Sequence, residues 1–189
     1  MSEDDDKRPQ HYRIPYPLAE RPAFRIGRSE FRVVDLSEKG IRFAFTGVDR
    51  LVIAEAVPAG VGLGEGQLFF TGTLALRPNR RVQFAPRGPG SHRIFLKPLL
   101  AIRFWDTEYP VLSGNAEWIE FVGPDRALLA YLPELTGQVE FSDEEVTPIR
   151  GRLVRVETGS CALHLSDGIP YPRIIAEQLR LYWRYRHLF

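Results

Sequence analysis

The chain has 189 residues, enough for one large domain or for one domain with a sizeable insertion. Its 25 Lys and Arg residues nearly balance 24 Asp and Glu residues, and the net charge of +1 argues against a general affinity for DNA, RNA or anionic membranes. The single cysteine excludes an intrachain disulfide, and no apolar run approaches the length of a membrane-spanning helix. We therefore expect a soluble, cytoplasmic protein without a membrane span.

The chain opens with an acidic stretch and continues with a basic one. Residues 1–7 are mostly acidic and are expected to form a disordered tail, or else a tail that competes with a ligand for nearby arginines. Arg8 and Arg13 follow. Guanidinium groups match phosphate oxygens and the O6/N7 edge of guanine, so this segment is a candidate for binding a guanine nucleotide.

Three segments in the first part of the chain have the alternation of β-strands: residues 23–26, 31–34 and 41–45. Between the last two lies Asp35-Leu36-Ser37-Glu38-Lys39-Gly40. Asp and Ser side chains bond to nearby backbone N–H groups and Gly accepts positive φ, so this stretch predicts a turn with an exposed carboxylate and hydroxyl. Such acceptors beside a basic segment again suit a guanine nucleotide.

The middle of the chain, residues 48–134, carries weaker signals. Segments 67–76, 81–84 and 116–122 have strand character, which predicts an ordered, β-rich insertion that either extends the sheet or forms a separate lobe. The alternating glycines of residues 60–66 lack a Rossmann fingerprint and a Walker Lys-Ser/Thr, and they predict a flexible connector. The aromatic residues of the insertion favour a core over a binding surface: Phe104, Trp105, Tyr109, Trp118 and Phe121.

Three further strands are predicted at residues 135–141, 149–156 and 161–165. Six strands with short connections predict a small antiparallel barrel, which has no free edges because it closes on itself. Cys161 and His164 stand three residues apart on a strand and therefore face opposite sides, so they are not a thiolate pair. Cys161 is expected to join Leu163 and Leu165 in the core.

The last segment changes to a helical period after Pro170-Tyr171-Pro172 and is expected to remain helical to about residue 187. We expect an apolar stripe of Ile175, Leu179 and Tyr182 to pack on the barrel. The arginines would then form a solvated face: Arg173, Arg180, Arg184 and Arg186. The alternative is a partner-binding or dimerising helix with Trp183 and Tyr185 as anchors.

A basic N-terminal segment followed by Asp-x-Ser-x-x-Gly resembles the PilZ domain, the bacterial receptor module for cyclic di-GMP. Residues 12–22 resemble the approach to the family's first barrel strand, and residues 151–178 resemble its closing strands and C-terminal helix. The Asp-x-Ser-x-x-Gly match is complete. The family's Arg-x-x-x-Arg motif is degenerate, because Arg13 fits its second arginine whereas Pro9 occupies the first position and Arg8 stands one residue early.

The resemblance implies a mainly β fold, with a six-stranded antiparallel PilZ-like barrel and C-terminal α-helix in residues 8–47 and 135–188, and an insertion of unknown role at 48–134. It implies a cyclic di-GMP receptor that couples ligand binding by an N-terminal arginine arm to interaction with an unidentified protein partner. Arg8 and Arg13 would hold phosphates or guanine, Asp35 and Ser37 would bind a guanine edge or orient the arginines, and Gly40 would let the backbone come close. Binding would order the arm.

Two other functions remain open. One keeps the fold without the ligand and is a protein–protein interaction module that uses the C-terminal helix and the aromatic residues of the insertion. The other is a barrel that carries an apolar ligand or an unrecognised hydrolase, for which only the aromatic insertion speaks. Because the sequence has no metal-ligand spacing or catalytic constellation, we expect no enzyme, no catalytic residues, no metal and no cofactor. The oligomeric state is not predicted.

Overall fold

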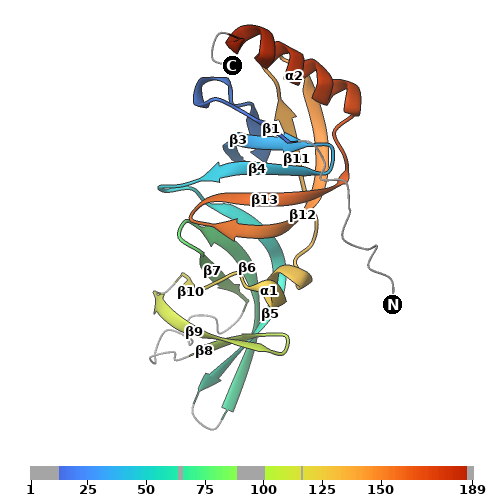
Figure 1. Cartoon of the computed structure of the whole chain (residues 1–189). Helices are drawn as coiled ribbons and strands as arrows, with labels where there is room; N and C mark the ends of the chain where they lie inside the picture. The colour runs from blue at the N-terminus through green and yellow to red at the C-terminus, as the bar shows by residue number, and fades with distance from the viewer. Residues whose placement is uncertain (1–12, 64–65, 89–100, 116, 187–189) are drawn as a thin grey trace, which may run out of the picture.

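The protein consists of two closed antiparallel β-barrels and a C-terminal helix (Figure 1). The structure is a computed structural model, and it describes residues 13–63, 66–88, 101–115 and 117–186. The predicted acidic tail at residues 1–7 lies outside this part of the chain. The prediction of a mainly β fold with a barrel and a C-terminal helix is confirmed.

The first barrel contains the six strands that the sequence predicted. They are β2 (Ala23–Ile26), β3 (Ser29–Ser37), β4 (Gly40–Phe45), β11 (Leu135–Glu140), β12 (Val146–Glu157) and β13 (Gly159–Asp167). The strands pair in the order β3-β2-β11-β12-β13-β4, and pairing between β3 and β4 closes the ring. A two-residue strand, β1 (Ile14–Pro15), pairs with β3 opposite Leu36 and Asp35, and a 3-10 turn at Leu18–Glu20 follows it.

Aromatic and aliphatic side chains fill this barrel because alternate residues of each strand point inward. Ile41, Phe43 and Phe45 share the inner face of β4, as predicted, and the ring of Phe43 lies 5.0 Å from those of Phe24 and Phe31. Cys161, Leu163 and Leu165 are buried as predicted, whereas His164 is exposed. Burial raises the pKa of the Cys161 thiol to about 12, which keeps it a thiol and not a thiolate.

The middle of the chain forms a second barrel, so it is a separate lobe and does not extend the first sheet. Its strands are β5 (Leu51–Leu63), β6 (Gly66–Arg77), β7 (Arg81–Arg87), β8 (Ala101–Phe104), β9 (Thr107–Gly114) and β10 (Ile119–Val122). They close in the order β10-β7-β6-β5-β8-β9, with β9 pairing with β10. The aromatic residues predicted for a core are largely there: Phe104, Tyr109 and Phe121 are buried, and Trp105 and Trp118 are partly buried.

The prediction of a flexible connector at residues 60–66 is wrong for residues 60–63 and 66, which lie in strands, and residues 64–65 lie outside the described residues. Gly60 and Gly62 lie in β5, paired with Phe69 and Gln67 of β6. A Cβ atom on Gly60 would lie 3.3 Å from the ring of Phe69, so the ring covers the glycine across the hairpin. Alternating glycines thus leave room for a cross-strand aromatic residue, and strand pairing overrides their low intrinsic strand propensity.

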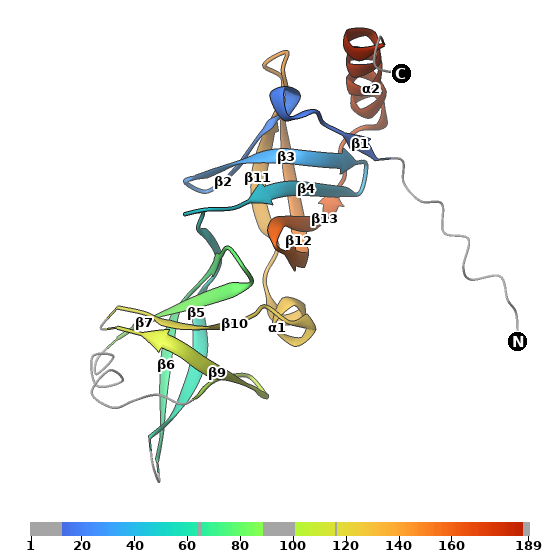
Figure 2. The same ribbon diagram turned by 60° about the vertical axis from the view of Figure 1, so that its left-hand side comes forward.

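Two helices complete the fold. Helix α1 (Arg126–Tyr131) follows the second barrel, and its N-cap Asp125 accepts bonds from the Leu128 backbone N–H and from the Tyr109 hydroxyl. Helix α2 (Tyr171–Tyr185) lies on the first barrel at the end of the molecule farthest from the second barrel (Figures 1 and 2). Neither described helix combines the length and the apolar composition that crossing a bilayer requires.

Candidate functional site

The candidate site centres on the carboxylate of Asp35, which lies between two guanidinium groups. Arg13 Nη1 donates to Asp35 Oδ1, and Arg42 lies 2.5 Å from Oδ2 through both Nε and Nη2. The Asp35 side chain is only 7% exposed, whereas those of Arg13 and Arg42 are 47% and 43% exposed. The carboxylate therefore holds the two arginines in place while each keeps donors free for a ligand. We call these three residues, with Ser37 and Gly40, the Asp35 cluster.

The prediction of an exposed carboxylate and hydroxyl on a turn is wrong. Asp35 and Ser37 lie within β3 and are buried, and only Glu38 and Lys39 form the turn before Gly40 begins β4. Strand β3 continues this far because Ser37 pairs with Gly40 in a two-residue hairpin and because β1 pairs with β3 at Asp35 and Leu36. Asp35 thus acts on its arginine neighbours and does not present a free edge to solvent.

Gly40 makes room for the guanidinium group of Arg13. A Cβ atom built on Gly40 would lie 2.6 Å from Arg13 Nη2, closer than two unbonded atoms approach, so the guanidinium lies over the bare backbone of Gly40. Ser37 Oγ lies beside the same glycine and contacts its carbonyl oxygen at 3.4 Å. The absence of a side chain at position 40 is therefore a condition for the position of Arg13.

The structure brings four of the five predicted site residues together: Arg13, Asp35, Ser37 and Gly40. Arg8 lies outside the described residues. Sequence reasoning missed Arg42, although a signal was present. Arg42 stands between the inward-facing Ile41 and Phe43, so it must point out of the barrel, and it pairs with Asp35 across the two strands. Within the described residues, no group of three His, Cys, Asp or Glu side chains is placed to hold a metal ion.

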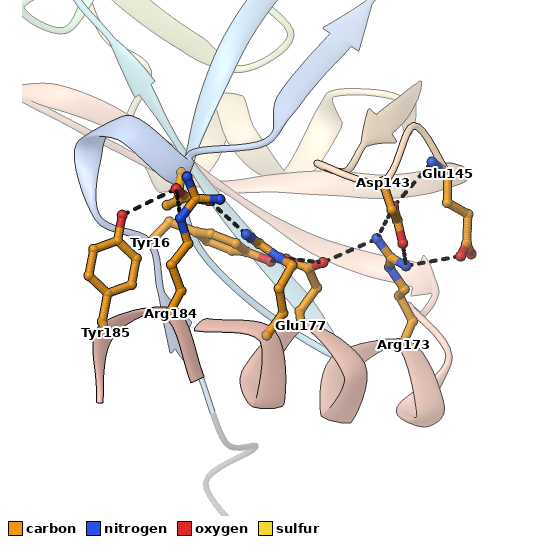
Figure 3. Close-up of polar contacts among 9 residues, drawn as sticks. Tyr16, Asp143, Glu145, Arg173, Glu177, Arg184 and Tyr185 are labelled. Atoms are coloured by element: carbon orange, nitrogen blue, oxygen red, sulfur yellow. Dashed lines mark hydrogen bonds and ion pairs between the residues drawn. The ribbon is translucent and has the colours of Figure 1, made fainter. Parts of the chain in front are cut away.

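A second polar cluster fixes helix α2 to the first barrel (Figure 3). Arg173 makes a two-pronged bond with Asp143 at 2.5 and 2.7 Å and lies 2.9 Å from Glu145, both in the turn between β11 and β12. The buried Glu177 accepts from the Tyr16 hydroxyl at 3.2 Å and from Arg173 and Arg180. We call the cluster the anchoring network; its members are Tyr16, Glu20, Asp143, Glu145, Arg173, Glu177, Arg180, Arg184 and Tyr185.

The network shifts several pKa values. The bond from Arg173 lowers the pKa of the Asp143 carboxyl to about 2, and the bond from Arg180 lowers the pKa of Glu20. Burial, with the neighbouring Glu177, raises the pKa of the Tyr16 hydroxyl far above its usual range. The carboxylates therefore remain charged and the phenol remains protonated across the physiological pH range.

The predicted orientation of α2 is wrong. Leu179 and Tyr182, expected to pack on the barrel, are both more than half exposed, whereas Arg173, expected in solvent, is buried with Ile174, Glu177 and Leu181. Arg180 also points to the barrel, and Arg184 reaches Glu20 at 3.0 Å. The reason is that the carboxylates that neutralise these arginines come from distant parts of the chain, which the helical periodicity of α2 alone does not reveal.

The two clusters share one short segment of the chain. Arg13 belongs to the Asp35 cluster, β1 follows it directly, and Tyr16 and Glu20 then bind α2. The backbone of Tyr16 also donates to the carbonyl oxygen of Val34 at 2.9 Å, one residue before Asp35. Arg13 thus stands only three residues before Tyr16, whose hydroxyl contacts α2. A change in the position of Arg13 therefore occurs close to that contact.

A hollow lies elsewhere, where the chain passes between the two barrels. Its volume is about 810 Å³, and its lining includes Arg28, Arg50, Glu55 and Glu134 beside apolar residues such as Val52. This mixed lining differs from the closed apolar cavity that the hypothesis of an apolar-ligand carrier requires. The hollow is also distinct from the Asp35 cluster, with which it shares no residue.

Comparison with known proteins gives no significant match, whether to protein-family models, to curated proteins or to solved structures. The functional assignment therefore depends on the geometry of the Asp35 cluster and on the resemblance of its motif.

Proposed function

We propose that this chain is a PilZ-like receptor for cyclic di-GMP and that the Asp35 cluster is its ligand-binding site. The observation that carries the proposal is the position of Arg13, whose guanidinium lies over Gly40 and bonds to Asp35, 22 residues away in the sequence. Arg13, the last residue of the basic segment, thus contacts the Asp-x-Ser-x-x-Gly stretch, and the combination of the two motifs resembles the family.

The charges of the cluster suit an anionic guanine ligand. Two guanidinium groups surround one carboxylate, which leaves a local net charge of +1 before Arg8 is added. In the proposal, the free donors of Arg13 and Arg42 bind phosphate oxygens or the O6/N7 edge of guanine, and Asp35 keeps both groups in a fixed orientation. A buried carboxylate with two bound arginines is already organised for this task, so little rearrangement opposes binding.

In the proposal, ligand binding is coupled to the partner through helix α2. Arg13 precedes β1 directly, and the same segment supplies Tyr16 and Glu20 to the anchoring network. A ligand that binds Arg13 therefore adds contacts to the segment that holds α2, and the helix presents the surface offered to a partner. Arg8 would add a further guanidinium to the ligand from the segment before Arg13.

Isothermal titration with cyclic di-GMP at moderate salt tests the proposal. We expect heat of binding at tens of micromolar protein, and a loss of affinity of about tenfold or more in Arg13→Ala, since a charge-assisted bond is worth roughly 1.5–3 kcal/mol. Arg25→Ala is the matched control, because Arg25 is an equally exposed barrel arginine that pairs with Glu30 and Glu140. Absence of heat, or equal affinity of the wild type and Arg13→Ala, would refute the proposal.

The second candidate is an interaction module that binds a protein without the nucleotide. The observation in its favour is that Trp183, on α2, is exposed. A binding partner that is captured by wild type and by Arg13→Ala but not by Trp183→Ala would support this candidate over the first. Three of the middle segment's aromatic residues named in the sequence analysis do not add to it, since they are in the core of the second barrel: Phe104, Tyr109 and Phe121.

A further inference from the structure

Helix α2 exposes several large apolar side chains on the side away from the barrel. Tyr171, Leu179, Tyr182 and Trp183 are between 51% and 62% exposed, and we call these four residues the aromatic stripe. At about 100° per residue they fall on one side of the helix, together with the half-buried Ile175, and the buried Arg173 and Glu177 fall on the other. Helix α2 thus has apolar residues on both sides: Ile174 and Leu181 are buried with Arg173 and Glu177, and the aromatic stripe is left exposed.

The size of the stripe exceeds what single exposed residues explain. Aromatic side chains have roughly 150–250 Å² of surface, so the three aromatic residues and the slightly smaller Leu179, each exposed by half or more, present about 450 Å² together. A patch of this size is comparable with the largest apolar patch of a typical monomer, roughly 300–600 Å², which is often functional. Tyr182 and Trp183 also pack edge to face at 5.7 Å, which holds the two rings as one rigid surface.

We propose that the aromatic stripe binds the aromatic stripe of a second copy of this chain, with the two α2 helices antiparallel across a two-fold axis. The exposed side of α2 has the spacing of a helix pair, since Ile175, Leu179, Tyr182 and Arg186 are separated by four, three and four residues. An antiparallel pair centred beside Leu179 places Ile175 opposite Tyr182 and brings the two Leu179 side chains together. The inference goes beyond nucleotide binding and does not depend on it.

Charge selects the antiparallel arrangement. Among the described residues on the exposed side of α2, Arg186 is the charged one, and its guanidinium lies 5.8 Å over the ring of Trp183. In the antiparallel pair, Arg186 of one chain lies opposite Tyr171 of the other, where it can stack on the ring as a cation on an aromatic face. The two Arg186 residues are then separated by about the 22 Å length of a 15-residue helix, whereas a parallel pair would place them side by side.

The shape of the molecule permits this contact. Helix α2 lies at one end, and both barrels extend away from it on the other side (Figures 1 and 2). Two copies can therefore approach through α2, and each presents the same surface to the other, as a two-fold interface requires. The pair of stripes buries about 900 Å², below the standard interface of roughly 1,200–2,000 Å², so we expect a dimer that dissociates on dilution.

An anionic membrane is a less suitable partner. A helix that lies on such a membrane uses Lys and Arg along its polar side to contact lipid headgroups. In α2, Arg173 and Arg180 instead bind Asp143, Glu20 and Glu177 of the anchoring network. Their charges are already neutralised beneath the helix, so the exposed side offers mainly apolar and aromatic contacts, which another such side matches.

Sedimentation equilibrium over a range from micromolar to near-millimolar protein tests the proposal. We expect the mass to rise from 21.6 kDa towards twice that value. Leu179→Glu, which would place two carboxylates together at the two-fold axis, is expected to raise the dissociation constant by about tenfold or more. Val48→Glu introduces the same charge at an exposed residue of the turn between β4 and β5 and should have no effect. A monomer at every concentration, or a dimer insensitive to Leu179→Glu, would overturn the proposal.

Cysteine cross-linking tests the direction of the helices without changing the charge of the stripe. The native Cys161 is buried, so it does not compete. Under mild oxidation Leu179→Cys should form a disulfide-linked dimer, whereas Tyr171→Cys and Arg186→Cys should cross-link only when the two variants are mixed. Cross-linking of Tyr171→Cys with itself would instead show a parallel pair. If the chain stays monomeric and sediments with phosphatidylglycerol vesicles in a manner that Leu179→Glu abolishes, the stripe binds membranes and the proposal is wrong.

Discussion

The two barrels and helix α2 are held by different combinations of contact. In the barrels, apolar side chains such as Phe43 and Phe121 are fully buried and every strand pairs on both sides through its ring neighbours. In α2, the buried face combines the charged Arg173 and Glu177 with the apolar Ile174 and Leu181, and the aromatic stripe faces solvent. The difference shows that a closed sheet depends on burial of apolar surface, whereas the attachment of an outer helix can add a buried ionic network to a small apolar contact.

The largest expected loss of stability comes from removing an apolar contact in the core of the first barrel. Phe43→Ala removes a ring that contacts Phe24 and Phe31, and we expect the free energy of unfolding to fall by about 3–5 kcal/mol. Urea denaturation followed by circular dichroism measures the change. Phe69→Ala is the matched control, because it deletes the same ring from an exposed position on the β5–β6 hairpin and should lower the free energy by less than about 1 kcal/mol. Equal losses in both variants would contradict the prediction.

The next largest effect comes from removing a charged contact between α2 and the first barrel. Glu177→Ala removes the acceptor shared by Tyr16, Arg173 and Arg180, and loss of one partner from a buried ionic cluster costs about 3–5 kcal/mol where the others stay buried. Here the loss cannot exceed the free energy that holds α2 on the barrel, because the helix then detaches and its arginines return to water. We therefore expect amide hydrogen exchange to accelerate in α2 while the barrel strands remain protected.

The control for this prediction is Glu157→Ala. Glu157 lies on β12, is exposed and contacts Arg155 at 3.4 Å, so its removal should change the free energy of unfolding by less than about 1 kcal/mol. Uniform acceleration of exchange in α2 and in the strands would show that the helix and barrel unfold as one unit, and the distinction drawn above would fail.

The same contrast explains what the sequence could predict. The strands of the first barrel were predictable because alternation is a local pattern, and Ile41, Phe43 and Phe45 show it within five residues. The closure of the second barrel was not predictable from the sequence, because it depends on the pairing of β9 with β10 and of β5 with β8. The residues of these strands have no local pattern that indicates which residues pair. The orientation of α2 was predicted wrongly, because Arg180 binds Glu20, 160 positions away.

The Asp35 cluster likewise has features that the sequence predicted and features that it did not. Asp35, Ser37 and Gly40 were found because they form a short contiguous motif, and Arg13 because it fits one position of a second motif. The burial of Asp35 and the part played by Arg42 were missed, since both follow from the hairpin that pairs Asp35 with Arg42. Local patterns therefore gave the identity of the residues, and only strand pairing gave their environment.

Acid should have a smaller effect, which differs between helix α2 and the barrel cores. The folded-state pKa of Asp143 is about 2 and that of Glu20 is lowered, compared with unfolded values of about 3.9 for Asp and 4.3 for Glu. A lowered pKa contributes stability that is complete above the unfolded value and is lost as the pH falls towards the folded one. Between about pH 4 and pH 2, α2 should therefore lose exchange protection before the barrel cores.

Asp143→Asn provides the control for the acid experiment, because it removes one of the titrating groups and should weaken the pH dependence of α2 in that window. The fall in protection should be moderate, since Asp143 itself is half exposed and solvent screens its bond to Arg173. Loss of protection in the strands at the same pH as in α2 would contradict the prediction.

The smallest effect on stability is expected for a substitution at Gly40. This substitution separates the binding site from the barrel that supports it, because it should change binding and leave the barrel's stability nearly unchanged. In Gly40→Ala the new Cβ would lie 2.6 Å from Arg13 Nη2, the movable end of a long side chain, and no closer than 3.5 Å to its other neighbours, Leu163 and Ser37. The free energy of unfolding should therefore change by less than about 1 kcal/mol, as for other substitutions that leave the core intact. Arg13, however, must leave its position over the backbone and lose its bond to Asp35.

The expected result is a variant that melts as the wild type does but binds cyclic di-GMP as weakly as Arg13→Ala. Gly151→Ala is the control for sterics, because there the Cβ would lie 2.4 Å from the backbone carbonyl oxygen of His164, which cannot move without distorting β13, and the barrel itself should be destabilised. If Gly40→Ala keeps wild-type affinity, the arrangement of Arg13 over Gly40 is not the one that receives the ligand. In that case the +1 cluster around Asp35 stabilises the hairpin alone, and the proposed receptor function loses its main support.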